Sequence, residues 1–394
     1  MPSIPMPTRL ASVDIYRGFV MFLMMAEVWE FGHVAKAFPD SGFWAFLHFN
    51  QSHVPWVGCS LHDLIQPSFS FLVGVALPYS LASRQASGQN NWQVWGHTFR
   101  RALILILLGI FLRSMYARQT NFTFEDTLTQ IGLGYVFLFA LGWVKERWQW
   151  IAFAAILLAY WALFASYPLP GPDFNWAEAG VAADWPHHAQ GFAAHWNKNA
   201  NAAWAFDRWF LNLFPRENVF RYNGGGYATL SFIPTLGTMI LGLVAGQWLK
   251  TAESTRTLLR KLLLFGGIFL AAGFLLNILG ICPNVKRIWT PSWTLFSGGW
   301  CFILLAGFYY VADLKQQGRW FYIFKVLGMN SIAAYVLAHT VIGFIDSSFR
   351  INVHPHYDMI FGEGYRTLVS GTVFLAVQFL VLDWMYRKRI FVKI

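Results

Sequence analysis

Apolar stretches of roughly 20 residues recur ten times along this 394-residue chain. A helix needs about 20 apolar residues to cross the hydrocarbon core of a bilayer, where only helices and closed barrels satisfy every backbone group. Charged residues make up 12% of the chain, about half the fraction that is usual in soluble domains. We therefore expect an all-α, polytopic membrane helix bundle. The expected spans are 14–35, 60–83, 98–117, 127–145, 148–167, 227–249, 261–281, 293–313, 322–346 and 365–386.

The loops between these spans predict the topology of a single membrane domain covering residues 1–394. Basic residues gather in one set of alternate loops, so the positive-inside rule places both termini in the cytoplasm. Loops 36–59 and 168–226 then face outward, and we expect no cleavable signal peptide. Topology also accounts for the net charge of +10, so we expect no nucleic-acid partner. The three cysteines have neither disulfide nor metal spacing, and no metal is expected.

Ionisable and amide side chains interrupt several of the expected spans. Glu27, Glu30 and His33 fall three residues apart, which predicts a polar stripe along one face of the first helix. Such groups are costly in lipid and usually face a cavity inside the bundle. Asn330 and His339 lie in the ninth span, where single polar residues most often join neighbouring helices. Because several helices carry polar groups, we expect a water-accessible cavity.

The stretch from His53 to Gly74, HVPWVGCSLHDLIQPSFSFLVG, has the composition of a reaction site. His53 ends a polar loop, and Asp63 stands where an apolar helix begins, a helix that we expect Pro67 to interrupt. A histidine titrates near neutral pH, and a carboxylate can orient or stabilise its ring. The alternative is an interfacial histidine without a chemical role. His62 and His339 are rival bases.

The outer loop 168–226 is rich in tryptophan, histidine and asparagine. Rings beside amide and carboxylate groups suit a carbohydrate, whose apolar face stacks on a ring while its hydroxyls form hydrogen bonds. An aromatic belt at the membrane interface has the same composition, and both interpretations stay open. The tryptophans are Trp176, Trp185, Trp196, Trp204 and Trp209.

Several short motifs together resemble the heparan-α-glucosaminide N-acetyltransferase family of transmembrane acyltransferases, in a bacterial type. The resemblance covers most of the chain and is strongest from His53 to Gly74. The matching motifs are Asp14-x-x-Arg17-Gly18, His53-x-x-Trp56-x-Gly58, Asp63-Leu64-Ile65, Pro67-x-Phe69-x-Phe71-x-x-Gly74, Gly242-Leu243-x-Ala245-Gly246, Trp289-Thr290-Pro291-Ser292-Trp293, and Gly328-Met329-Asn330-Ser331-x-x-x-Tyr335 with His339.

The resemblance implies transfer of an acetyl group from cytoplasmic acetyl-CoA to an amino sugar or glycan on the other side of the membrane. His53 matches the family's catalytic histidine, and Asp63 matches its aspartate. Supporting roles are considered for Glu27, Glu30, His62, Asn330 and His339. Arg100 and Arg101 are candidates to hold the CoA phosphates, although topology alone also explains them.

The expected setting is the bacterial inner membrane, with membrane lipid as a partner and a homodimer as one possible assembly. Two other functions compete with the acyltransferase hypothesis. A secondary transporter would use Glu27, Glu30 and Asp63 as a proton or substrate path. A non-catalytic envelope protein would not need His53 at all.

Overall fold

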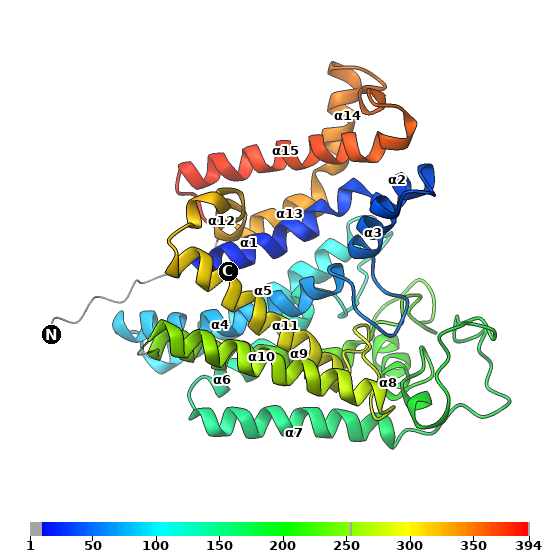
Figure 1. Ribbon diagram of the computed structural model, residues 1–394. Coiled ribbons are helices and arrows are strands. Elements are labelled where there is room, and N and C mark those ends of the chain that lie inside the picture. Colours follow the sequence, from blue (N-terminus) through cyan, green and yellow to red (C-terminus); the bar gives the residue numbers. More distant parts are fainter. Residues whose placement is uncertain (1–9, 253, 393–394) are drawn as a thin grey trace. The chain divides into compact units, whose positions relative to one another are not determined.

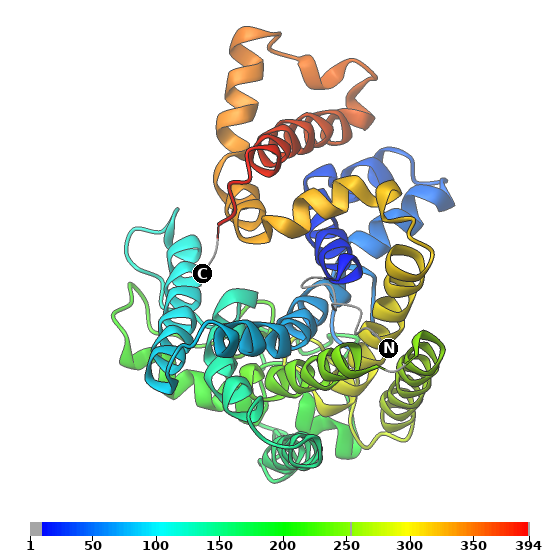
Figure 2. The ribbon, with the colours of Figure 1, turned by 90° about the vertical axis from the view of Figure 1, so that its left-hand side faces the viewer.

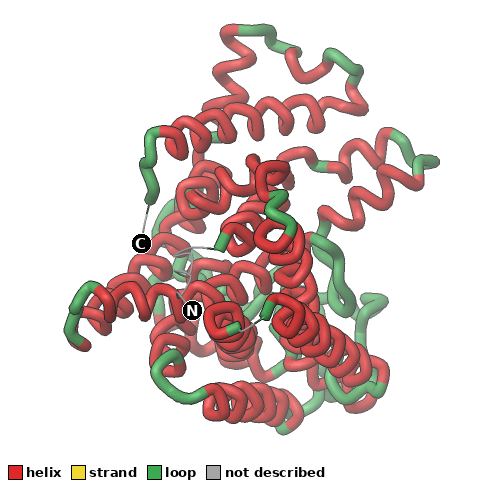
Figure 3. The backbone as a smooth tube through the Cα atoms, turned by 60° about the vertical axis from the view of Figure 1, so that its left-hand side comes forward, coloured by secondary structure: helices red, strands yellow, loops and turns green. Residues whose placement is uncertain are grey.

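Helices and the loops between them build the described part of the chain, as Figure 3 shows. The computed structural model describes residues 10–252 and 254–392, and within these ranges the only extended pairing is one antiparallel bridge between Val57 and Val285. Residues 1–9, 253 and 393–394 lie outside the described residues. The chain ends, which we predicted to be cytoplasmic, are therefore not described. The all-α expectation is confirmed.

Every expected span has a helical counterpart. By length and composition, seven of the described helices can cross a membrane, and up to nine spans result if each of two bent helix pairs counts as one. The fourth expected span corresponds to the shorter apolar helix α6, Thr127–Leu141. The chain is thus an integral membrane protein, while ten crossings and their sidedness stay predictions. The seven are His62–Ala86, Asn91–Ser114, Glu146–Ala165, Thr229–Thr251, Thr255–Ile278, Pro291–Leu314 and Glu363–Arg387.

Two spans expected to be continuous are broken. Helix α1, Ala11–Met25, passes into a 3-10 turn, and Glu30 then takes the left-handed conformation with a φ of 45° before α2, Phe31–Ala37. The two parts meet at 43°. The ninth span bends by 72° at Asn330, between α12, Tyr322–Met329, and α13, Ser331–Thr340. A further helix, α14, follows from Ile342 to Asn352.

The chain divides into two compact units. The first unit comprises the described residues of Met1–Val54, Ser60–Ile65 and Leu304–Lys393, and the second comprises Pro55–Cys59 and the described residues of Gln66–Ile303. In the first unit, α1 packs against α12 and α13, and α15, Arg366–Arg387, packs against α12 (Figure 1). The expectation of a single membrane domain stays a prediction.

The second unit is a bundle whose helix axes lie roughly parallel to one another, so that Figure 2 shows several of the helices nearly end-on. Its members are α4 (Ile65–Ala86), α5 (Asn91–Ser114), α6, α7 (Glu146–Ala165), α9 (Phe232–Thr251), α10 (Thr255–Ile278) and most of α11 (Pro291–Phe308). Glycines bring α4 and α9 into backbone contact. A Cβ on Gly242 would lie 1.9 Å from the Phe71 carbonyl oxygen, so no larger residue fits there.

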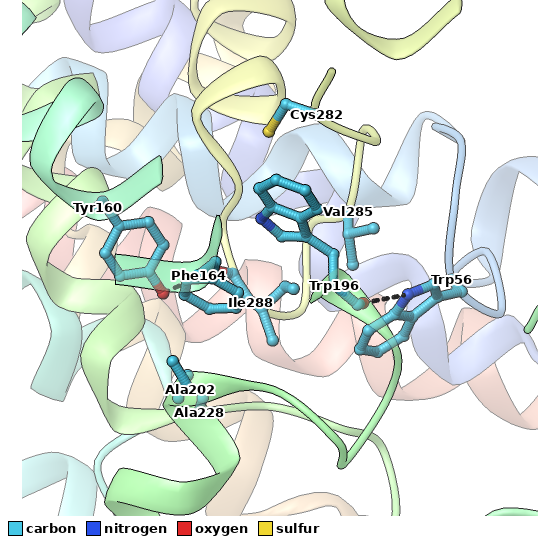
Figure 4. Packing of buried hydrophobic residues seen from close by; sticks show 10 residues of the cluster. Trp56, Tyr160, Phe164, Trp196, Ala202, Ala228, Cys282, Val285 and Ile288 are labelled. Atoms are coloured by element: carbon cyan, nitrogen blue, oxygen red, sulfur yellow. Dashed lines mark hydrogen bonds between the residues drawn. The ribbon is translucent and has the colours of Figure 1, made fainter. Parts of the chain in front are cut away.

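Residues 168–226 form an ordered part of the second unit. They include the helix α8, Ala202–Phe210, and a 3-10 turn, Gly191–Trp196. The Trp196 side chain is fully buried, and its carbonyl oxygen accepts a hydrogen bond of 3.0 Å from the Trp56 indole nitrogen (Figure 4). Trp56 belongs to the motif that begins at His53, and this apolar cluster holds its side chain within the second unit.

Candidate functional site

His53 and Asp63 are in direct contact within the first unit. The Nδ1 atom of His53 lies 2.8 Å from Oδ1 of Asp63. The Asp63 side chain is 1% exposed, whereas the His53 side chain keeps 35% of its surface accessible. The contact expected from the sequence is therefore present. A buried carboxylate thus holds one nitrogen of a histidine ring that is partly accessible.

Asp63 is fixed in place by three further donors at its second oxygen. Oδ2 accepts hydrogen bonds from the Val54 N–H at 3.2 Å and the Ser60 N–H at 3.1 Å. The Ser60 hydroxyl lies 3.0 Å from the same oxygen and also 2.6 Å from the Ser52 carbonyl, and it can donate to one of them at a time. Oδ2 of Asp63 therefore faces two backbone N–H groups, which can only donate.

Local sequence explains why Asp63 occupies this position. Ser60 and Asp63 form a reciprocal cap at the start of α4, because the Asp63 N–H also points to the Ser60 hydroxyl at 3.3 Å. The 3-10 turn His62–Leu64 then leads into the helix at Ile65. Asp63 therefore has a structural role as a helix cap in addition to its contact with His53. The Ser-x-x-Asp pattern before an apolar run is a readable signal that the sequence analysis missed.

The expected interruption of this helix at Pro67 is wrong. Pro67 lies in the first turn of α4, and the helix continues unbroken to Ala86. Proline is tolerated in a first turn because the N–H that it lacks has no partner inside the helix. The proline in the interior of α4 is Pro78, whose carbonyl oxygen accepts a hydrogen bond of 3.4 Å from Nζ of Lys250.

The hydrogen bond at Nδ1 decides which ring nitrogen can act as a base. An ionised carboxylate only accepts, so Nδ1 must carry the hydrogen that it donates to Asp63. In the neutral ring, the lone pair is then on Nε2. When Nε2 takes up a proton, the negative charge of Asp63 stabilises the resulting imidazolium. The pair has the base-and-orienter geometry found in enzymes that activate nucleophiles.

His62 and Glu27 lie beside this pair. The His53 and His62 ring centroids are 4.6 Å apart, and the His62 Nε2 is 3.9 Å from a carboxylate oxygen of Glu27. His62 is buried, whereas the Glu27 side chain is 68% exposed. His62 and Glu27 therefore add an imidazole and a carboxylate next to the His53–Asp63 pair.

The predicted stripe of Glu27, Glu30 and His33 is not one helical face. The left-handed residue Glu30 ends the first helical segment, and the chain changes direction there. Glu30 is exposed, and the His33 Nε2 lies 3.3 Å from the Glu363 carbonyl oxygen. Of the three residues, the described contacts place Glu27 beside His62.

Gln51 and Asn50 support the site, and the sequence analysis did not identify them. Gln51 ends helix α3, Gly42–Gln51, two residues before His53. Its side-chain oxygen accepts from the Phe31 N–H at 2.8 Å, and its nitrogen donates to the Ala26 carbonyl at 2.6 Å. Gln51 thus satisfies backbone groups at the break in the first span. The Asn50 side chain accepts a hydrogen bond of 3.3 Å from the Leu61 N–H.

Asn330 and His339 use their polar atoms elsewhere in the first unit. The buried Asn330 amide donates to the Ile390 carbonyl at 2.8 Å and accepts from the Val392 N–H at 3.1 Å. His339 is exposed, and its Nδ1 lies 2.8 Å from the Tyr335 carbonyl oxygen. Within the described residues, no hydrogen bond joins either side chain to His53.

The two candidate arginines lie on α5 in the second unit. Arg101 donates to the Tyr135 hydroxyl at 3.0 Å, and its guanidinium lies 4.7 Å from the centre of the same ring. Arg100 is exposed. Arg101 is therefore held against α6 by an aromatic side chain, and a role of either arginine toward CoA phosphates stays a prediction.

Comparison with known proteins identifies two curated relatives. Heparan-alpha-glucosaminide N-acetyltransferase of Homo sapiens is 24% identical over 99% of this chain, and the protein of the same name from Mus musculus is 22% identical over 98%. The chain spans about 60% of the length of these relatives. No family model matches the chain.

Proposed function

We propose that this chain, which is related at the family level to the heparan-alpha-glucosaminide N-acetyltransferases, is a transmembrane acyltransferase. In this proposal it moves an acetyl group from acetyl-CoA to an amino sugar or a glycan. The observation that carries the proposal is the 2.8 Å contact between His53 and the buried Asp63, which accepts several further hydrogen bonds. The names of the two relatives supply the reaction and the class of acceptor.

The chemistry assigned to His53 is general base catalysis. Its Nε2 takes the proton from the acceptor amine or hydroxyl as that group attacks the thioester carbonyl. The carbon–sulfur bond then breaks, and the imidazolium returns the proton to the departing sulfur. Asp63 stabilises the imidazolium and holds the ring in the reactive tautomer. A positioned base of this kind contributes about 10²–10⁴-fold to a rate.

A covalent route uses the same two residues. Here Nε2 of His53 attacks the thioester carbonyl, the carbon–sulfur bond breaks, and the CoA thiolate leaves while the ring carries the acetyl group. The acceptor then attacks the acetyl carbon, the carbon–nitrogen bond to the ring breaks, and the proton of the acceptor goes to the thiolate. Asp63 again compensates the positive charge that develops on the ring. The two routes differ in whether labelled acetyl stays on the protein when the acceptor is withheld.

The proposal places acetyl-CoA in the cytoplasm and the acceptor on the opposite side, with Arg100 and Arg101 as candidate partners of the CoA phosphates. It further assigns the chain to a bacterial inner membrane, in contact with lipid, and leaves open whether two copies associate. Glu27 has a supporting role in this scheme, in which its carboxylate positions the buried His62 ring beside His53.

A secondary transporter is the second candidate, and the pair of Glu27 and His62 favours it. A carboxylate 3.9 Å from a buried imidazole is a plausible proton-binding group in a membrane protein. A transporter moves its solute unchanged, whereas an acyltransferase produces an acetylated one. The chemical identity of the product therefore separates the two functions.

The test uses the purified protein in sealed proteoliposomes with labelled acetyl-CoA on one side and glucosamine or a β-glucosaminide on the other. Acetylated sugar that forms only with both substrates present supports the acyltransferase. Uptake of unmodified sugar without any acetyl-CoA requirement supports the transporter. If neither acetylated product nor acetyl-CoA binding is detected, the donor assignment is wrong.

A further inference from the structure

We propose that loop 168–226 carries a binding cleft for an amino-sugar oligosaccharide, separate along the chain from His53 and Asp63. The loop encloses a cavity of about 590 Å³ whose lining residues all lie between Asp173 and Arg221. Cavities of about 300–1,000 Å³ are typical of ligand sites. The inference rests on the proposed function only in identifying the bound glycan with the acetyl acceptor.

Aromatic side chains supply the apolar part of this cleft. Phe174, Trp204 and Phe220 line the cavity, and the rings of Phe174 and Trp204 meet edge to face at 5.9 Å. The Trp204 indole nitrogen donates to the Arg221 carbonyl at 2.9 Å, which fixes the plane of the ring. All three rings are partly accessible. A preorganised ring of this kind can stack on the apolar face of a sugar without first losing rotamer freedom.

Charged side chains complete the lining. The carboxylates of Asp173 and Glu178 are exposed, and neither has a salt-bridge partner among residues 10–252 and 254–392. Arg208 and Arg221 also line the cavity, and the Arg208 guanidinium lies 4.8 Å from the Trp204 ring centre. The acidic groups come from one segment of the loop and the basic groups from another. The lining of the cleft therefore includes both anionic and cationic groups.

This combination specifies the chemical class of the ligand. Ring faces select a pyranose, and carboxylates without ion-pair partners attract the ammonium group that a free amino sugar carries at neutral pH. The guanidinium groups can donate hydrogen bonds to hydroxyl or acidic substituents of the same chain. We infer an oligosaccharide that contains unacetylated glucosamine, which is also the form that an N-acetyltransferase consumes.

The test is calorimetric binding of a chitosan oligosaccharide, a chain of glucosamine units, to the full-length protein carrying His53→Ala and without acetyl-CoA. Trp204→Ala is compared with Trp209→Ala, because Trp209 lies on the same helix α8, is 61% exposed and does not line the cavity. We expect Trp204→Ala to weaken binding about tenfold, from the apolar area that one sugar face buries. Trp209→Ala should leave the Kd unchanged. No binding by the parent protein, or equal effects of both substitutions, would overturn the proposal.

A second variant tests the charge and remains informative if Trp204→Ala fails to fold. Glu178→Gln removes one exposed carboxylate and should weaken chitosan binding about two- to fivefold. It should not change binding of the N-acetylated chitin oligosaccharide, which carries no ammonium groups. An equal effect on both probes, or no effect on chitosan, contradicts the assigned ligand.

These outcomes are independent of the proposed acetyl transfer. Binding that depends on Trp204, in a protein that shows no transfer, keeps the cleft and removes the enzyme assignment. Acetyl transfer by a protein whose oligosaccharide binding and KM do not change with Trp204→Ala keeps the enzyme and removes the cleft.

Discussion

Replacing Asp63 by asparagine should leave the shape of the site intact and place the wrong tautomer on His53. An amide has one oxygen where the carboxylate has two. The Val54 and Ser60 N–H groups both point at Oδ2, so the amide oxygen must occupy that side. The amide nitrogen then faces His53 and donates to Nδ1, which moves the ring hydrogen to Nε2 and removes the base.

The geometry sets the size of this effect. Turning the amide over would leave two backbone N–H groups opposite an NH₂ group, and each buried donor without an acceptor costs about 1–3 kcal/mol. A cost of about 2 kcal/mol or more confines the productive orientation to roughly one molecule in thirty. Loss of the compensating charge lowers the rate further, toward the roughly 10⁴-fold known for an equivalent change in a serine protease. We therefore expect Asp63→Asn to lower kcat at least about 30-fold.

The assay is the initial rate of acetyl transfer at saturating substrates, together with thermal unfolding of each variant. Asp126→Asn is the matched control. Asp126 is also a buried helix-capping aspartate, which accepts from the Leu128 and Thr129 N–H groups, and none of its hydrogen bonds within residues 10–252 and 254–392 involves a histidine. Both variants should lose some stability, and the control should keep its kcat. A loss of less than about tenfold in Asp63→Asn would refute the tautomer argument.

Three further outcomes follow from other parts of the structure. Gln51→Leu leaves the Phe31 N–H and Ala26 carbonyl without their partner, and should lower both Tm and kcat; a variant with an unchanged kcat would show that this link does not position His53. Burial raises the pKa of Asp207 to about 7, so its protonated form stabilises the folded state fully below about pH 4, and this stabilisation is lost as pH rises through 7. Asp207→Asn should thus raise the free energy of unfolding at pH 8 by at most about 4 kcal/mol, seen as a higher Tm, and should change Tm little at pH 4. Equal shifts of Tm at both pH values would contradict this. Gly242→Ala should lower the free energy of unfolding by about 1–3 kcal/mol, because the added Cβ meets the backbone of α4. Gly96→Ala, on the open face of α5, should leave the free energy of unfolding unchanged or raise it, and thermal unfolding of the two variants measures both effects.

The sequence predicted those helices and contacts that depend on residues close together along the chain. The apolar runs located the long helices, because burial in lipid demands a length that a sequence shows directly. The contact of His53 with Asp63 was also within reach, since a polar loop and a helix start so close in the sequence have little freedom to separate. Pro67 was misread because the first turn of a helix, unlike its interior, does not need the N–H that proline lacks.

Contacts between distant residues decide the features that the sequence could not show. Nothing near Glu30 indicates that the helix ends there, because the partner for the freed Ala26 carbonyl comes from Gln51 on another helix. At the break at Asn330, the Asn330 side chain likewise donates to the carbonyl of Ile390, a residue 60 positions further along the chain. A periodic pattern assumes an unbroken helix, so the stripe of Glu27, Glu30 and His33 could not be assigned correctly from spacing alone.

The most direct test of the account compares His53→Ala, His62→Ala and His339→Ala for transfer of labelled acetyl from acetyl-CoA to glucosamine by the purified protein. The account predicts that His53→Ala lowers transfer about 10²–10⁴-fold, that His62→Ala lowers it, and that His339→Ala, on an exposed ring bonded to its own helix, leaves it intact. Adding Asp63→Asn to His53→Ala should then cost nothing more, because the two residues act as one unit. A rate that is unchanged in His53→Ala and lost in His62→Ala would contradict the assignment of the base.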